Sequence, residues 1–347
     1  MAQKMKVALL TKPGVIEIVE RGIPVPADDE VLIRVRAVGL CGSDVHYYEH
    51  GKIGPYVVEK PIILGHEASG DIAAAGKNVR HLKEGQRVAI EPGVTCGRCA
   101  HCKAGRYNLC PHVRFLATPP VDGAFCEYIA MRSDFVFPIP DHLSYEAAAM
   151  VEPLSVGIHA VRRGRLQPGQ TVAVFGMGPV GILAAVAAKA FGAKRVIGVD
   201  LEAFRLDVAL RMGATDVVNI RERDPVEAIR AMTDGIGVDL AVETAGNPKA
   251  LQAAVASVRR GGSVSVVGLP PQNEAPLNVS HVVDNEIDIR GVFRYRNTYP
   301  AGIDLLAAGQ IDLSPMFTDK MSLENTPEAF RKAIHEKSRT VKIVIYP

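Results

Sequence analysis

The spacing of apolar and polar residues divides the 347-residue chain into two regions of different character. Up to about residue 150, short runs of alternating apolar and polar residues are separated by Gly and Pro, at 5–11, 15–19, 30–40, 86–92 and 127–131. Alternation with a period of two is typical of strands that bury one face. This region therefore predicts a barrel or an irregular β domain without a long helix.

From about residue 170 the pattern changes to continuous apolar runs that alternate with helical segments. The expected strands are 171–176, 195–200, 216–220, 238–246, 263–269 and 287–293, and the expected helices are 179–193, 225–233 and 248–262. Buried strands that alternate with helices predict a parallel sheet covered on both faces. Helical segments at 298–310 and 325–337 and a strand at 340–346 follow, and we expect this tail to return to the first domain.

The length of the chain exceeds what one hydrophobic core usually supports, so we expect one domain from 1–155 and 293–347 and another from 156–292. The net charge of +2, without a long basic run, gives no electrostatic reason for a nucleic-acid or membrane partner. No segment has the pattern of a signal peptide or a membrane span, which favours a soluble cytoplasmic protein. In a reducing compartment, six cysteines indicate zinc or reactive thiols rather than a disulfide framework.

A glycine-rich turn, GMGPVG at 176–181, follows the first apolar strand of the second region and opens a helix. Gly176 permits a tight turn, Gly178 lets the backbone approach a pyrophosphate, and Gly181 lets the helix pack closely on the strand. The helix N-terminus also attracts phosphate charge. We interpret this turn as a dinucleotide site, with a purely structural turn as the alternative.

Asp200 ends the next expected strand, where a carboxylate can accept both hydroxyls of the adenosine ribose and would repel a 2′-phosphate. This residue predicts NAD rather than NADP. Arg205 is a candidate for stacking on the adenine, and a solvated helix arginine is the alternative. Val267, Gly268 and Leu269 end another expected strand, where they can touch the nicotinamide half because ligands bind beyond the carboxyl ends of such strands.

Four closely spaced cysteines, Cys96, Cys99, Cys102 and Cys110, lie in the segment 91–112. Four thiolates can supply all corners of a tetrahedral zinc ion. Such a site has no open position for substrate or water, so we interpret it as a structural zinc that fastens a loop. Four free or disulfide-bonded thiols are the alternative.

A second group of residues mixes thiolate, imidazole and carboxylate: Cys41 in CGSDVH, and His66 with Glu67 in GHE. This is the ligand set of an open catalytic zinc site. Single His and Cys residues are more often structural, so composition alone leaves the assignment open.

The whole chain resembles the zinc-dependent medium-chain dehydrogenases, through GHEASGDIAAAG at 65–76, the four-cysteine segment and the GMGPVG turn. Within that superfamily it is similar to the polyol branch, the sorbitol and xylitol dehydrogenases. The strings that carry this closer likeness are CGSDVHYYEHGKIG at 41–54, RFLATPPVDGAF at 114–125, VEPLSVGIHA at 151–160 and GVFRYRNTYP at 291–300. The resemblance implies an α/β protein with a GroES-like β-rich catalytic domain and a Rossmann domain with a doubly wound parallel sheet.

By resemblance, Cys41, His66 and Glu67 hold the catalytic zinc, with Glu152 as a direct ligand or joined through water. Glu152 stands where the alcohol dehydrogenases have a second cysteine ligand, so their Cys-His-Cys site is not expected here. To the cofactor residues the resemblance adds Val180, Val292, Phe293 and Arg294. It assigns the substrate to Tyr47, Phe115, Thr118, Glu152, Arg294 and Tyr295, although without the family the last two would read as an ordinary polar loop.

The expected reaction is the oxidation of a sugar alcohol, sorbitol or xylitol, to fructose or xylulose with NAD. We expect a homotetramer, with a dimer as the alternative because both occur among relatives, and one catalytic and one structural zinc in each subunit. Ser43 is the candidate to pass the hydroxyl proton outward, with His46 as terminal acceptor, and Glu152 is the rival base acting through water.

Two alternatives remain. One is a threonine dehydrogenase or another secondary-alcohol dehydrogenase of the same superfamily, and the other is a non-catalytic nucleotide-binding protein with this fold. Glu152 and the segment FRYRNTYP at 293–300 favour a polyol substrate. The complete set of zinc ligands argues against the non-catalytic protein.

Overall fold

The computed structural model describes residues 3–270 and 274–347, and the chain forms two compact units. Unit 1 comprises Met1–Glu152, Tyr299–Gly309 and Phe317–Pro347, and unit 2 comprises Pro153–Thr298 and Gln310–Met316. The sequence-based division placed 153–155, 293–298 and 310–316 in the first domain. In the structure the segment 293–298 stays with unit 2, where Arg162 donates a hydrogen bond to the carbonyl of Asn297.

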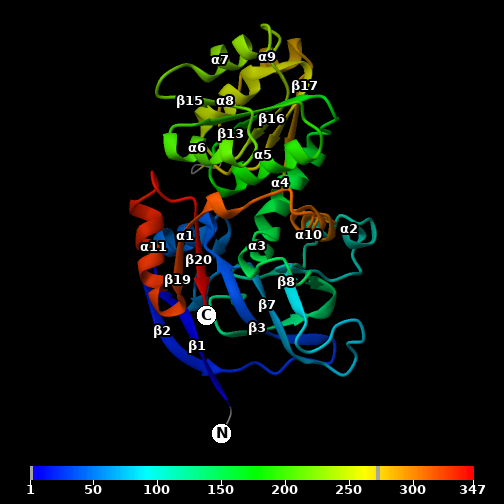
Figure 1. Cartoon of the computed structure of the whole chain (residues 1–347), viewed down its shortest axis with the longest axis vertical. Helices are drawn as coiled ribbons and strands as arrows, with labels where there is room; N and C mark the ends of the chain where they lie inside the picture. Colours follow the sequence, from blue (N-terminus) through cyan, green and yellow to red (C-terminus); the bar gives the residue numbers. More distant parts are fainter. Residues whose placement is uncertain (1–2, 271–273) are drawn as a thin grey trace. The chain divides into compact units, whose positions relative to one another are not determined.

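Unit 1 is built mainly from short β-strands. A seven-stranded sheet has the order β12-β8-β7-β3-β20-β19, with β11 also paired to β3, and β1 pairs with β2 and β6 in another sheet. The C-terminal strand β20 pairs with β3, so the end of the chain returns to the sheet of the first domain (Figure 1). The strands are β1 (Lys4–Lys12), β2 (Val15–Gly22), β3 (Glu30–Gly39), β4 (Lys52–Ile53), β5 (Tyr56–Val57), β6 (Ile62–Ile63), β7 (Glu67–Ala75), β8 (Arg87–Ile90), β9 (Gly93–Val94), β10 (Arg114–Phe115), β11 (Tyr128–Arg132), β12 (Val136–Pro138), β19 (Phe317–Ser322) and β20 (Lys342–Tyr346).

The helices of unit 1 are short. They are α1 (Gly42–His50), α2 (Ala100–Lys103), α3 (Tyr145–Ala149), α10 (Tyr299–Ala307) and α11 (Thr326–His335), with single 3₁₀ turns η1 (Tyr107–Leu109), η2 (Ser133–Phe135) and η4 (Leu323–Asn325). The alternation pattern did not predict α1, because this helix buries only Asp44 and Tyr47 and so lacks an apolar stripe. The final helix α11 packs against β2, β19 and β20 (Figure 1).

Unit 2 contains a six-stranded parallel sheet in the order β15-β14-β13-β16-β17-β18. This order confirms the predicted doubly wound sheet, in which the direction of winding reverses between β13 and β16. Every residue of β13 is buried, as expected for a strand covered on both faces. The strands are β13 (Thr171–Phe175), β14 (Arg195–Asp200), β15 (Asp216–Asn219), β16 (Val238–Glu243), β17 (Val258–Val266) and β18 (Asp288–Gly291).

Helices cover both faces of this sheet, with α5 and α6 on one side and α7, α8 and α9 on the other (Figure 1). The helices are α4 (Val151–Arg163), α5 (Pro179–Ala190), α6 (Ala203–Arg211), α7 (Pro225–Met232), α8 (Pro248–Ser257) and α9 (Val279–Asp284), with a 3₁₀ turn η3 (Ser314–Met316). Among residues 3–270 and 274–347, no helix has the length and apolar character needed to cross a membrane.

The predicted helix at 248–262 is too long. Helix α8 ends at Ser257, and Val258 already pairs with Val238 as part of β17. Arg259 then forms an ion pair with Asp239 of β16 at 2.6 Å. Pairing with the neighbouring strand therefore overrides the helical pattern over these residues.

Candidate functional site

The candidate catalytic ligands meet where β3 and β7 run side by side. These strands pair antiparallel with Gly39 opposite Glu67, and Cys41 follows the one strand while His66 precedes the other. The donor atoms of Cys41, His66 and Glu67 all lie within 4.8 Å of one another. A Cβ on Gly39 would lie 2.0 Å from Oε2 of Glu67, so only glycine leaves room for this carboxylate. The mixed donor set fits an open zinc site.

A buried carboxylate that the sequence analysis did not single out joins these two segments. Asp44, in the first turn of α1, is completely buried and accepts hydrogen bonds from the backbone N–H groups of Cys41 and Gly65, at 3.0 Å each. Its Oδ1 lies 3.5 Å from Nδ1 of His66. A carboxylate at one imidazole nitrogen orients the ring and leaves the other nitrogen for a metal. The spacing of Asp44 from Cys41 is a helix-capping signal that could have identified it.

The electrostatic field at this cluster favours a cation. Burial lowers the pKa of His66, but the charges of Asp44 and Cys41 outweigh it and hold the pKa well above its ordinary value. A proton and a metal ion bind the same imidazole nitrogen and compete for it. Negative surroundings that hold a proton on His66 therefore also favour a bound metal cation.

Glu67 is paired with a buried lysine from the opposite end of the chain. Nζ of Lys342 lies 2.8 and 2.6 Å from the two carboxylate oxygens of Glu67 and donates to the carbonyl of Leu40 at 3.1 Å. Burial lowers the pKa of Lys342, whereas Glu67, Cys41 and Glu152 raise it, with a net rise that keeps the ammonium form. No local sequence pattern marks Lys342, because its partner is remote in the chain.

A further buried carboxylate, Glu152, belongs to the same region of unit 1. It is 5% exposed at the start of α4, and its charge raises the pKa of both Lys342 and Glu91. Burial is the main cause that raises the pKa of Glu91 to about 7, opposed by a hydrogen bond from a tyrosine hydroxyl at 2.8 Å. The ring of Phe115, on β10, lies 5.7 Å from that of His66. Phe115 thus lies beside the candidate ligand His66. The charge of Glu152 acts on Lys342, the partner of the candidate ligand Glu67.

The other unit 1 residues predicted for proton transfer and substrate lie on α1 and after β10. On α1, Ser43 is half-buried, Tyr47 is buried and His46 is exposed. Partial loss of hydration and the neighbouring His50, whose ring lies 5.9 Å away, lower the pKa of His46. Thr118 is half-buried in the turn that follows β10. The roles of these residues stay predictions.

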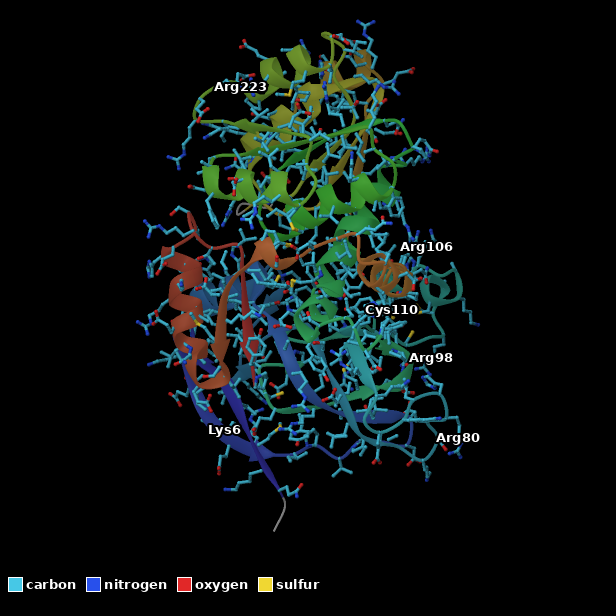
Figure 2. The ribbon with its side chains drawn as sticks, in the orientation of Figure 1. Lys6, Arg80, Arg98, Arg106, Cys110 and Arg223 are labelled. Atoms are coloured by element: carbon cyan, nitrogen blue, oxygen red, sulfur yellow. The ribbon has the colours of Figure 1, made fainter. Side chains whose placement is uncertain are left out.

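The four-cysteine segment folds into a compact thiol cluster. The Sγ atoms of Cys99 and Cys102, and those of Cys96 and Cys110, lie 3.5 Å apart, and those of Cys96 and Cys102 lie 4.0 Å apart. Sulfur atoms about 2.3 Å from a tetrahedral zinc are separated by about 3.8 Å, whereas a disulfide needs about 2.05 Å. The spacing therefore fits a structural zinc with four free thiols as ligands. Figure 2 shows Cys110 in this lobe, together with Arg98.

One thiol of this cluster is already favoured as thiolate. Backbone N–H groups of Arg98 and Cys99 lower the pKa of Cys96 to about 6. Burial, by contrast, raises the pKa of Cys102 to about 11. Zinc binds the thiolate form, so a metal ion would supply the charge that Cys102 needs in order to deprotonate.

The glycine-rich turn of unit 2 connects β13 to α5. Gly176 has a φ of +94°, in the left-handed region that favours glycine. A Cβ on Gly178 would meet open space, whereas a Cβ on Gly181 would lie 1.8 Å from the carbonyl oxygen of Gly176. The environment of Gly176 fits a tight turn, and that of Gly178 leaves room for a pyrophosphate. The environment of Gly181 fits close packing of the helix on the strand. Val180 lies in the first turn of α5.

Asp200, at the end of β14, is tied to this turn. Its Oδ2 accepts a hydrogen bond from the N–H of Met177 at 2.6 Å, and its Oδ1 accepts from Leu201 and Glu202 at 2.7 and 2.8 Å. A carboxylate has about four acceptor positions, so Asp200 can fix the turn and still accept from a ribose hydroxyl. Arg205 is half-buried on α6.

The segment that follows β17 carries three more predicted cofactor residues. The N–H groups of Val267 and Gly268 donate to the carbonyl of Glu243 at 2.8 and 3.1 Å, and Leu269 is 74% exposed. They lie beyond the carboxyl end of the strand, where ligands of such sheets bind.

The segment that follows β18 carries the last predicted cofactor and substrate residues. Val292 donates its N–H to the carbonyl of Val266 at 2.9 Å, and the guanidinium of Arg294 lies 4.8 Å from the ring centroid of Phe293. Tyr295 is buried. The structure assigns Arg294 and Tyr295 to unit 2, whereas the other predicted substrate residues belong to unit 1.

Both units match family models. Residues 27–141 match the alcohol dehydrogenase GroES-like domain, and residues 179–308 match the zinc-binding dehydrogenase model. An alcohol dehydrogenase GroES-like domain together with a zinc-binding dehydrogenase domain defines a zinc-dependent dehydrogenase.

Relatives narrow this class further. The sorbitol dehydrogenase of Bacillus subtilis (strain 168) is 60% identical over 345 residues, covering 99% of this chain and 98% of that protein. The human sorbitol dehydrogenase is 43% identical over 321 residues, covering 92% and 89%. The crystal structure of an oxidoreductase/dehydrogenase of unknown specificity from Escherichia coli superposes with a TM-score of 0.95 at 37% identity, covering 99% of each chain. The chain belongs to the polyol dehydrogenase branch of the zinc-dependent medium-chain dehydrogenases.

Replacing Lys342 with Met should destabilise the metal-free protein by about 3–5 kcal/mol, because Glu67 would remain as an unpaired buried charge. Added zinc should restore part of this stability by taking over the carboxylate. Thermal unfolding with and without zinc measures both effects. Lys320→Met is the control, because it breaks an ion pair with Glu146 in which the lysine is 58% exposed, and should cost less than about 1 kcal/mol. Equal losses in the two variants would refute the proposed pairing.

Replacing Cys110 with Ser should remove the structural zinc, lower the unfolding temperature and leave appreciable activity in the protein that folds, because this cluster has no open position. Metal analysis, calorimetry and an NADH assay measure the three properties. Cys126→Ser is the control, since Cys126 is buried outside the cluster and should leave the zinc content unchanged. A well-folded but inactive Cys110→Ser protein would contradict the structural role.

Replacing Asp200 with Ser should shift the ratio of kcat/KM for NAD over NADP toward NADP by about tenfold or more, corresponding to about 1.4 kcal/mol of lost discrimination. Steady-state kinetics with both cofactors measure the ratio, and unfolding curves show whether the turn has loosened. Asp207→Ser, on the exposed face of α6, is the control for a lost carboxylate. An unchanged ratio in the Asp200 variant would rule out its ribose role.

Proposed function

We propose that the protein is an NAD-dependent zinc polyol dehydrogenase that oxidises a secondary hydroxyl of sorbitol or xylitol to the ketone of fructose or xylulose. The observation that carries this proposal is the cluster of half-buried Cys41 with buried His66 and Glu67, whose mixed donors can hold a metal and leave a position for substrate. The relatives named sorbitol dehydrogenase support a sugar alcohol as the substrate.

Oxidation of a secondary alcohol removes a hydride from carbon and a proton from oxygen. Zinc would supply the Lewis acid that lowers the pKa of the hydroxyl, and NAD would supply the hydride acceptor. The chain's own groups bind, orient and carry the proton. Cys41, His66 and Glu67 would hold the metal, with Asp44 orienting the imidazole at 3.5 Å.

Two routes are open to the proton. Glu152 is a buried carboxylate whose charge reaches Lys342, and it would accept the proton through water. Ser43 lies two residues after Cys41 in the first turn of α1 and would pass the proton toward exposed His46 on the same helix. The lowered pKa of His46 keeps it neutral near pH 7 and able to accept a proton. The ring of Phe115 would form an apolar wall beside His66.

We further propose a homotetramer in a reducing, cytoplasmic compartment. The resemblance to the polyol branch supports the tetramer. The free thiols of the four-cysteine cluster support the compartment, because oxidation to disulfides would remove its metal ligands.

Initial rates of NADH formation with sorbitol, xylitol, ribitol, arabinitol and threonine test the function, before and after chelation and after zinc is restored. We expect turnover of at least one polyol, loss of turnover on chelation and recovery with zinc. Cys41→Ser and His66→Ala should each lower kcat/KM by at least about 1,000-fold, or about 4 kcal/mol of transition-state stabilisation. Cys126→Ser should not. Turnover that survives metal removal, or turnover of threonine alone, would overturn the proposal.

A further inference from the structure

Five arginines from separate segments of unit 2 surround a hollow of about 280 Å³. They come from the end of α4, the end of β18 and the segment after β18: Arg162, Arg163, Arg165, Arg290 and Arg296. None of the residues that line the hollow belongs to the GMGPVG turn, and Asp200 is not among them. The hollow is therefore separate from the nucleotide site.

The positive charge around this hollow is poorly balanced. Within the described part of the chain, Arg290 alone of the five has a carboxylate within 4 Å, that of Asp288. Like charges that line one hollow repel one another even across water. Gathering five guanidinium groups is therefore unfavourable unless an anion offsets their charge.

Three of the arginines are fixed by backbone carbonyls. Arg162 donates to Asn297 at 2.9 Å, Arg163 donates to Gly291 at 3.3 Å, and Arg290 donates to Arg163 at 3.1 Å. The dipole of α4 also favours cations at its C-terminal end. Each guanidinium carries five N–H donors, so these bonds hold the groups in place and leave donors for a ligand.

Arg165 and Arg296 are not fixed in this way. Neither side chain forms a hydrogen bond or ion pair with any described residue. Arg165 is exposed and directly follows α4, where a left-handed residue with a φ of +57° ends the helix and the helix dipole favours a cation. Arg296 is half-buried on the segment after β18, where no helix dipole acts on it. The unmatched charge of Arg296, in a hollow shared with four other arginines, is the observation that indicates a ligand.

The wall of the hollow includes His159, which is 5% exposed. Burial and the charges of Arg296, Arg163 and Arg162 lower its pKa to about 4. The imidazole is therefore neutral at pH 7 and offers one N–H donor without adding to the charge.

We propose that this arginine pocket binds a small phosphate-bearing anion at a site distinct from the nucleotide turn. Arginine presents paired N–H groups that match the oxygens of a phosphate group, and several arginines can share its charge. The hollow is slightly smaller than the range of about 300–1,000 Å³ that is typical for drug-sized ligands, so the ligand is inorganic phosphate or a short phosphate monoester.

Titration calorimetry at about 0.15 M salt tests the proposal, with NAD in excess so that the nucleotide turn is occupied. Inorganic phosphate and glycerol 3-phosphate serve as probes, and their relative affinities separate the free ion from an ester. We expect a Kd below about 1 mM for at least one probe. In Arg165→Gln/Arg296→Gln protein the binding should weaken by about 10-fold or more, because two of the cationic donors to the phosphate are lost.

The control variant is Arg223→Gln/Arg230→Gln, which removes the same charge elsewhere in unit 2; Arg223 lies on the connection between β15 and α7 (Figure 2). This control should keep the Kd within about twofold, and all variants should bind NAD equally, which shows that unit 2 has folded. Absence of binding by the unaltered protein would overturn the proposal. Equal weakening in both double variants would also overturn it, since binding would then reflect net charge alone.

Discussion

Asp44 accepts hydrogen bonds from two chain segments that would otherwise be separate loops, one after β3 and one before β7. Its carboxylate is completely buried, and a buried acceptor without partners costs about 1–3 kcal/mol or more when it is charged. The two backbone donors therefore fix the helix start and the His66 segment together. Because Ser43 and Tyr47 lie on that same helix, the candidate ligands, proton carrier and substrate residue share one rigid frame.

The second constraint is electrostatic and joins β7 to the C-terminal strand of the chain. Glu67 starts β7, and Lys342 starts the last strand, β20, which pairs with β3. Both side chains are 1% exposed, so neither charge is tolerable alone. The sheet must close with β20 before Glu67 is neutralised. Formation of the metal site is thus coupled to completion of the unit 1 fold. The coupling is made by Lys342, which is not itself one of the candidate metal ligands.

The sequence predicted best what short stretches of chain determine. The GMGPVG turn, the strand that ends at Asp200 and the four-cysteine spacing are local patterns, and their geometry in the structure fits what these patterns demand. Asp44 has a local helix-capping signal, but α1 was not predicted because it lacks an apolar stripe, and so the capping role of Asp44 was missed. Lys342 and Gly39 could not be identified, since their importance arises from contact with Glu67 across the sheet. The end of α8 was misplaced for the same reason, because pairing of Val258 with β16 decided it.

The two metal-type clusters of unit 1 differ in charge as well as in openness. Four thiolates around a zinc ion would leave a net negative site, which has no tendency to draw electrons from a hydroxyl. At the other cluster, one thiolate and one carboxylate would balance the charge of zinc. The ammonium of Lys342 offsets one of the two further buried carboxylates, Asp44 and Glu152, so this site is less negative than the four-thiolate site. Buried surroundings strengthen this difference, because screening by water is weak there. Lys342 compensates the buried charge of Glu67 when no metal is bound. When zinc is bound, the same lysine would weaken the donation of negative charge from Glu67 to the metal. The zinc would then be a stronger Lewis acid, which alcohol oxidation requires.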